Sequence, residues 1–225
     1  MRKTSSLRTP LEKGLLKIVF RQENKYPNFT FIFFNTKYCY HLLHLIQKKR
    51  MELQSLYQNA IEFAGEKHYS HKMPAVKANY LVHLSNVAME VLIASFYTKN
   101  FDVNFAVQVA ILHDTLEDTD TSFMELETEF GSKIAQGVLA LTKDEYVPLQ
   151  EQMTDSIARI KAFSHEVWAV KLADRITNLQ TPPSHWHKDR TLRYKNESDL
   201  IYKELKDGNS YLAKRLKEKI KLYAL

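Results

Sequence analysis

The chain has 225 residues, 44% of them hydrophobic and 26% charged, which is enough for one hydrophobic core of ordinary size. Its 5 Gly and 6 Pro argue against a collagen-like repeat, a glycine-rich nucleotide loop and a turn-dense β-sandwich, and its single cysteine, Cys39, excludes an internal disulfide and fits the reducing cytoplasm. No apolar run reaches the roughly 18 residues that span a bilayer, so we expect no membrane partner, and the net charge of +6 is concentrated in one part of the chain.

Residues 1–50 form a basic, aromatic-rich N-terminal segment. They hold 11 Lys and Arg against 2 Asp and Glu, a net charge of +9, whereas residues 51–225 hold 21 against 24 and are mildly acidic. Nucleic-acid-binding proteins normally carry their basic surface on the folded domain, so we expect no nucleic-acid partner; such binding would rest on residues 1–50 alone. Residues 27–40 favour a β-strand, but no partner strand is evident from the sequence.

The stretch that begins at Met51 has the pattern of an opening helix. We therefore interpret residues 1–50 as an extension outside the folded domain, residues 51–225, and we expect Met51 to be the physiological start. A tail that binds a membrane surface or a protein partner is the alternative interpretation. Mass spectrometry of the native N-terminus tests the expectation, because peptides from before residue 50 contradict a start at Met51.

From residue 51 on, apolar residues recur at the spacing of an α-helix, and no strand-like alternation of any length appears. Asp102 or Asn104 can cap one helix, Ser122 with Glu125 fits a capping box for the next, and Gly131 ends it. The sequence predicts an all-α domain without an internal repeat. Its expected helices start with the stretch 51–68. Apolar stripes over 81–92 and 106–112 indicate the next two, and further helices are expected over 122–131, 132–141, 149–163, 165–180, about 186–207 and 209–223.

The segment 111–119 is the most informative part of the sequence. It ends an apolar helix with one imidazole and three carboxylates, those of His113, Asp114, Glu117 and Asp118. On one continuous helix His113 and Glu117 share a face, as do Asp114 and Asp118. Carboxylates this close repel one another, and burying them is costly unless a cation compensates. Any one of these residues alone fits a solvated helix end or a core histidine, but the cluster predicts a metal site.

One helix cannot surround an ion, so further ligands must come from elsewhere in the chain. His83 lies in an apolar stretch near the start of a predicted helix, and Asp174 closes the apolar run 167–173. Two His with two Asp form a mixed nitrogen and oxygen set, which suits manganese, iron or zinc better than a thiolate-preferring ion. The alternative for Asp174 is a structural salt bridge with Arg175.

The order of His83, the pair His113-Asp114 and the distant Asp174 resembles the signature of the HD superfamily. Within it, the segment 113–119 (HDTLEDT) resembles the LLHD-x-x-EDT segment of RelA/SpoT-type alarmone hydrolases. Three further segments resemble landmarks of that family in the same order, namely Phe130-Gly131, residues 141–144 (LTKD) and residues 170–179 (VKLADRITNL). The resemblance covers about residues 60–205. It implies an HD-domain helical bundle and a small, metal-dependent hydrolase that removes the 3′-pyrophosphate from (p)ppGpp-like alarmone nucleotides.

The resemblance also implies roles for individual residues. One divalent ion, manganese in this family, would be held by His83, His113, Asp114 and Asp174. The catalytic acidic pair, which orients a water and accepts its proton, would be Glu117 and Asp118. Nucleotide contacts would come from Lys72, Asn178 and Tyr194. Candidates to neutralise the pyrophosphate are Lys72, Lys77, Lys143 and Arg175, although Lys77 and Lys143 fit a solvated surface better.

Departures from the family pattern put the base preference in question. The family has an arginine beside the position of Lys72, where this chain has Met73, and a proline after the first metal histidine, where this chain has Leu84. The same chemistry on an adenine alarmone or on NADPH is therefore an alternative to a guanine substrate. A non-catalytic nucleotide-binding regulator is a further alternative, which the intact acidic pair argues against.

Overall fold

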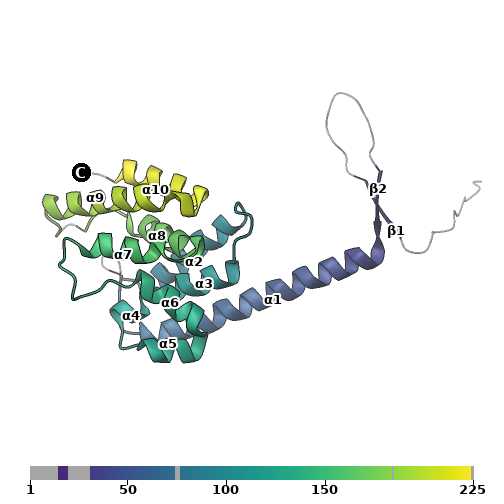
Figure 1. The fold of residues 1–225 in the computed structure, drawn as a ribbon, viewed down its shortest axis with the longest axis horizontal. Coiled ribbons are helices and arrows are strands. Elements are labelled where there is room, and N and C mark those ends of the chain that lie inside the picture. Colours follow the sequence, from purple (N-terminus) through teal and green to yellow (C-terminus); the bar gives the residue numbers. More distant parts are fainter. Residues whose placement is uncertain (1–14, 20–30, 74–76, 184, 224–225) are drawn as a thin grey trace, which may run out of the picture. The chain divides into compact units, whose positions relative to one another are not determined.

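The structure is a computed structural model that describes residues 15–19, 31–73, 77–183 and 185–223 (Figure 1). The chain divides into two compact units, Met1–Glu52 and Leu53–Leu225. Helices dominate the described residues, which confirms the prediction of an all-α domain, whereas the domain boundary after residue 50 stays a prediction. No helix among the described residues is both long and apolar enough to cross a bilayer.

The first unit contains a two-stranded antiparallel sheet. Strand β1 (Leu15–Val19) pairs along its whole length with strand β2 (Phe31–Asn35). Aliphatic and aromatic residues fill both strands, and such side chains favour the pleated backbone. The expectation that the β-prone segment has no partner is therefore wrong. Helix α1 (Thr36–Lys67) begins directly after β2, so Met51 lies within a helix and does not open one.

The second unit is a bundle of helices around three central members. Helices α2 (Leu81–Ser95), α3 (Val103–Leu112) and α8 (His165–Asn178) pack against one another in its centre (Figure 1). This central group carries the site described below.

The remaining helices cover the central group on two sides (Figure 1). On one side α9 (Lys188–Leu205) and α10 (Ser210–Leu222) pack on each other and on α8, joined by a short 3-10 helix, Lys206–Gly208. On another side α6 (Ser132–Leu141) packs on α3, with α5 (Phe123–Phe130) against it. Helices α4 (Thr115–Asp118) and α7 (Gln152–Lys161) complete the unit.

Several helix ends follow the signals in the sequence. A side-chain oxygen of Asp102 accepts a hydrogen bond from the Phe105 N–H at 3.1 Å, which identifies the N-cap of α3. The Ser122 hydroxyl accepts one from the Glu125 N–H, also at 3.1 Å, and caps α5. Gly131 ends α5 with a φ of 83°, a conformation that glycine adopts without strain.

Burial of α3 and α8 positions the site. Seven of the ten residues of α3 are buried, and a helix that is apolar on nearly all sides lies inside a domain. His113 directly follows this helix, and Asp174 lies within α8; both side chains are buried. Polar groups that the core holds in this way must find partners, because an unpaired buried polar group is costly.

Candidate active site

The four predicted metal ligands come together from separate elements. His83 lies in the first turn of α2, Asp174 lies in α8, and His113 and Asp114 lie in the turn between α3 and α4. The expected helix end at Leu112 is confirmed, and a two-residue turn separates α3 from α4, which begins at Thr115. Consecutive residues of a continuous helix do not face each other, so the break lets His113 and Asp114 reach the same point.

The side-chain atoms of these residues converge closely. The Nε2 atoms of His83 and His113 are 3.4 Å apart. A carboxylate oxygen of Asp114 lies 3.0 Å from the Nε2 atom of His113 and 3.5 Å from that of His83. An oxygen of Asp174 lies 3.7 Å and 3.5 Å from the same two nitrogens. Bonds of about 2 Å to a shared ion put ligand atoms roughly 3–3.5 Å apart. The ligand atoms of His83, His113 and Asp174 all lie within 4.8 Å of one another, which fits one ion, and Asp114 lies beside the two histidines.

Hydrogen bonds behind the cluster orient the two imidazoles. The Nδ1 atom of His113 lies 2.8 Å from the carbonyl oxygen of Ala110, which can only accept, so Nδ1 carries a proton and Nε2 is the atom directed at the cluster. The Nδ1 atom of His83 lies 3.4 Å from the hydroxyl of Thr177. Both Nε2 atoms face the cluster, where each could bind an ion once it has lost its proton.

Neighbouring side chains hold the two carboxylates. The hydroxyl of Tyr80 donates a hydrogen bond of 2.5 Å to Asp114. The ammonium of Lys171 lies 3.1 Å from one oxygen of Asp174, and the amide of Asn178 donates to the other. The alternative that Arg175 pairs with Asp174 is thus not what the structure shows, since Lys171, one turn earlier on α8, is the partner.

The charges of the cluster favour a bound cation. Burial alone would lower the pKa of His113, but the carboxylates of Asp114 and Asp174 outweigh it and raise that pKa to about 10. Burial alone would raise the pKa of Asp114, and His113 holds it well below its usual range. A positive charge at this point is therefore stabilised strongly, as a proton or as a metal ion. The donor set and its electrostatics fit a divalent metal ion.

The two acidic residues after the cluster have different surroundings. Glu117 accepts hydrogen bonds from the Lys143 ammonium at 2.7 Å and from the Lys143 backbone N–H at 3.0 Å. Partial burial of the Asp118 carboxyl, together with the charges of Asp114 and Glu117, raises the pKa of Asp118 to about 6. A carboxyl that titrates close to neutral pH suits a general base, whereas Glu117 is fixed by an ion pair.

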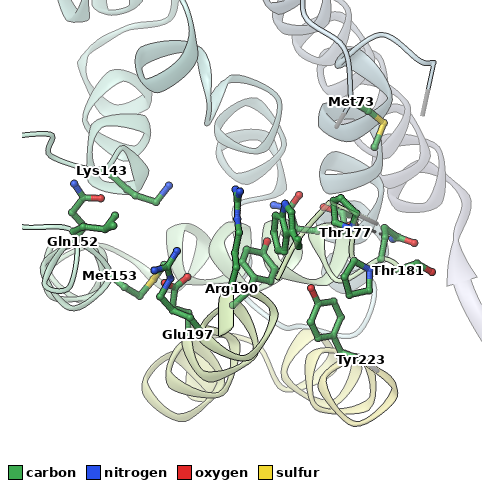
Figure 2. A pocket seen from close by; sticks show the side chains of 17 residues that line it. Met73, Lys143, Gln152, Met153, Thr177, Thr181, Arg190, Glu197 and Tyr223 are labelled. Carbon is green, nitrogen blue, oxygen red and sulfur yellow. Dashed lines mark hydrogen bonds between the residues drawn. The ribbon is translucent and has the colours of Figure 1, made fainter. Parts of the chain in front are cut away.

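A cavity of about 410 Å³ adjoins the cluster (Figure 2). The cavity is lined by Asn178, which contacts Asp174, and by Thr177, which contacts His83. Lys143 also lines it. Tyr194, also predicted to bind the nucleotide, contributes to the wall. Volumes of this size hold small organic ligands.

Comparisons with known proteins match this site to one family. Residues 60–209 match the model of the HD domain. The chain belongs to the HD-domain family. It is 34% identical over 164 residues to the guanosine-3′,5′-bis(diphosphate) 3′-pyrophosphohydrolase MESH1 of Danio rerio, covering 70% of this chain and 88% of the relative. It is 30% identical to the MESH1 of Xenopus tropicalis, covering 72% and 91%.

A solved structure supports the same assignment. It is described as a metazoan ortholog of SpoT that hydrolyses ppGpp, and it superposes with a TM-score of 0.66 at 25% identity, covering 74% of this chain and 94% of that chain. The expected resemblance to small HD-superfamily alarmone hydrolases is thereby confirmed.

Other basic residues predicted to act on the substrate lie in different places in this HD domain. Lys72 is exposed, forms a β-bridge with Asn79 and does not line the cavity, although its neighbour Met73 does. Lys77 is exposed and is likewise absent from the cavity wall. Lys143 is exposed, as expected, but its ammonium pairs with Glu117 and it lines the cavity.

Two side chains that bind the carboxylates of the cluster, Lys171 and Tyr80, were not predicted from the sequence. Lys171 lies within an apolar run, and its spacing of three residues from Asp174 was a usable signal. Tyr80 precedes His83 by three residues, but nothing local indicates that its hydroxyl reaches Asp114.

Arg190 and Arg193 were missed as residues of the cavity wall. Arg190 lies four residues before Tyr194 on α9 and shares its face, so the predicted role of Tyr194 could have led to Arg190. The guanidinium of Arg190 lies over the ring of Trp186 at 4.2 Å, and Trp186 also lines the cavity.

Proposed function

We propose that this protein is a metal-dependent hydrolase that removes the 3′-pyrophosphate from guanosine-3′,5′-bis(diphosphate). The observation that carries the proposal is the convergence of two histidine Nε2 atoms and two aspartate carboxylates beside a cavity with free arginines. The kinship with MESH1 proteins, whose names state this activity, supplies the substrate class. Water adds to the phosphorus attached to the 3′ oxygen, the bond between that phosphorus and the 3′ oxygen breaks, and the products are guanosine diphosphate and pyrophosphate.

His83, His113, Asp114 and Asp174 would hold one divalent ion, for which we propose manganese. When bound, such an ion acts as a Lewis acid that makes water more acidic and a phosphoryl group more electrophilic. The mixed nitrogen and oxygen ligand set is compatible with manganese. Competition between divalent ions for the purified protein, read by metal analysis, tests the choice of metal.

Asp118 would accept the proton of the attacking water. Its pKa of about 6 leaves it mostly ionised at neutral pH and still basic enough to take up a proton. Glu117 would act beside it by holding the Lys143 ammonium at the edge of the cavity. The ion pair keeps one cation where the pyrophosphate must lie, and charge-assisted hydrogen bonds to phosphate are strong.

The cavity would hold the rest of the nucleotide. Among the described residues, neither Arg190 nor Arg193 forms an ion pair with a carboxylate, so both guanidinium groups are available to phosphate oxygens. Asn178 and Tyr194 would contact the nucleotide from the same wall. Lys72 would have to reach the substrate from outside this wall.

Met73 favours a second candidate substrate, the adenine alarmone. An uncharged thioether lines the cavity where the related family carries an arginine, and a thioether contacts purine rings without selecting their hydrogen-bonding edges. NADPH remains a third candidate for the same chemistry.

The decisive experiment measures pyrophosphate released from ppGpp, from ppApp and phosphate released from NADPH by the full chain, with manganese and with EDTA. Manganese-dependent release from ppGpp supports the proposal. Release from ppApp alone would identify the adenine alarmone as the substrate. Metal-independent release, or none from any nucleotide, would contradict the proposed function.

A further inference from the structure

Tyr223 closes one side of the nucleotide cavity. It directly follows α10, and its backbone N–H donates to the carbonyl oxygen of Lys219, which fixes the residue at the end of that helix. Only 6% of the residue is exposed, yet it lines the cavity. Figure 2 shows the ring rising from α10 toward the other lining residues, with its oxygen at the cavity end.

The hydroxyl of Tyr223 has no hydrogen-bond partner among the residues that the structure describes. Tyr223 lines the cavity, and its oxygen points toward the other lining residues in Figure 2. Burial raises the pKa of this phenol, so the hydroxyl keeps its proton at neutral pH and can donate. A buried tyrosine hydroxyl usually has a hydrogen-bond partner, and a ligand that displaces solvent from the cavity could take that place.

The labelled lining residues nearest Tyr223 in Figure 2 are uncharged, and Arg175, whose charge lowers the pKa of Tyr223, does not line the cavity. Thr177 and Thr181 lie near Tyr223 in Figure 2, whereas Lys143 and Glu197 lie on the opposite side of the cavity. The two sides therefore differ in chemistry. Phosphate groups are stabilised at the charged side, and a sugar or a base, with its hydroxyl, carbonyl and ring-nitrogen groups, suits the uncharged side.

We propose that the hydroxyl of Tyr223 donates a hydrogen bond to the base–ribose part of the bound nucleotide and so helps to select it. The ring of Tyr223 lies 6.2 Å from that of Tyr194, and the two rings form one aromatic wall on which this part of the ligand rests. The proposal rests on the proposed function, because it assumes that the cavity binds a nucleotide.

The test separates the two halves of the substrate by using the products, which are not turned over. Isothermal titration of manganese-loaded protein with guanosine diphosphate and, separately, with pyrophosphate gives two dissociation constants. Tyr223→Phe removes one hydroxyl and keeps the ring, so the variant should fold. It is expected to weaken binding of guanosine diphosphate about 3–10-fold and to leave binding of pyrophosphate unchanged.

Tyr211→Phe is the matched control, because it makes the same change on α10 outside the cavity, where Tyr211 stacks on Tyr97. It should leave both constants unchanged. Unaltered binding of guanosine diphosphate by Tyr223→Phe would overturn the inference, and so would an equal loss of pyrophosphate binding, which would place the hydroxyl on phosphate. Hydrolysis of ppGpp by the unaltered protein is measured separately, so failure of the proposed function is recognised independently.

Discussion

The metal cluster and the nucleotide cavity adjoin each other, yet their polar groups are satisfied in different ways. In the cluster, Asp114 and Asp174 already have partners inside the protein, and His113 is oriented by a carbonyl oxygen. In the cavity, Arg190 and the hydroxyl of Tyr223 have no polar partner among the described residues. The first region is assembled before any substrate arrives, whereas the second is completed by the substrate. Changes in the cluster should therefore act on metal and rate, and changes in the cavity on affinity.

The largest effect is expected from Asp114→Asn. The change removes a carboxylate that faces both histidines, so the protein should lose its bound metal and its turnover, by about a thousandfold or more if the ion supplies several kcal/mol. Metal content and pyrophosphate release are measured together. Asp120→Asn, six residues on with a side chain 90% exposed, is the control and should change neither. Full activity of Asp114→Asn would contradict the assigned site.

How far the sequence predicts each region follows from the same contrast. The cluster is carried by residue types that are rare in apolar surroundings, so His83, His113, Asp114 and Asp174 stand out from their neighbours. The cavity wall comes from segments whose residues look ordinary one by one, and only packing brings Trp186, next to α9, toward Asn178 at the end of α8.

The missed strand pairing has a physical cause of the same kind. The pairing of β1 with β2 escaped because the two strands are separated along the chain and strand pairing is non-local.

A second prediction separates proton transfer from metal binding within the cluster region. Asp118→Asn should keep the metal and lower kcat by about 10²–10⁴-fold, because it removes the group that accepts the proton. Glu117→Gln should also keep the metal and lose most activity, since it releases Lys143. The pH dependence gives an independent reading at saturating metal. Asp118 with a pKa of about 6 is protonated below that pH, so kcat of the unaltered protein should fall about tenfold per unit below pH 6.

In Asp118→Asn this acidic limb should disappear. If the limb persisted unchanged in the variant, another group would be the base. Loss of metal from either variant would mean that the acidic pair belongs to the ligand set.

A third prediction addresses the cavity alone. Arg190→Met keeps the length and the apolar contact with Trp186 but removes the charge, so KM for the nucleotide should rise about 10–100-fold with metal content unchanged. Lys188→Met, an exposed position two residues earlier on α9, is the control and should leave KM unchanged. A fall in kcat without a change in KM would show that Arg190 stabilises the transition state, and it would weaken the contrast between the two regions.

The smallest effect is expected from Tyr80→Phe, which tests how much the internal partners of the cluster contribute. The change removes the hydroxyl that donates to Asp114 and keeps the ring, which stacks on His68 at 5.0 Å between ring centres. One hydrogen bond to a carboxylate is lost, so the dissociation constant of the metal should rise about 3–30-fold, while kcat at saturating metal stays within about twofold. Tyr57→Phe, whose hydroxyl lies 3.4 Å from Ser85 and away from the cluster, is the control. Metal affinity equal to that of the unaltered protein would show that the ligands hold their places without this support, and a loss of kcat at saturating metal would show that Tyr80 acts on the reaction itself.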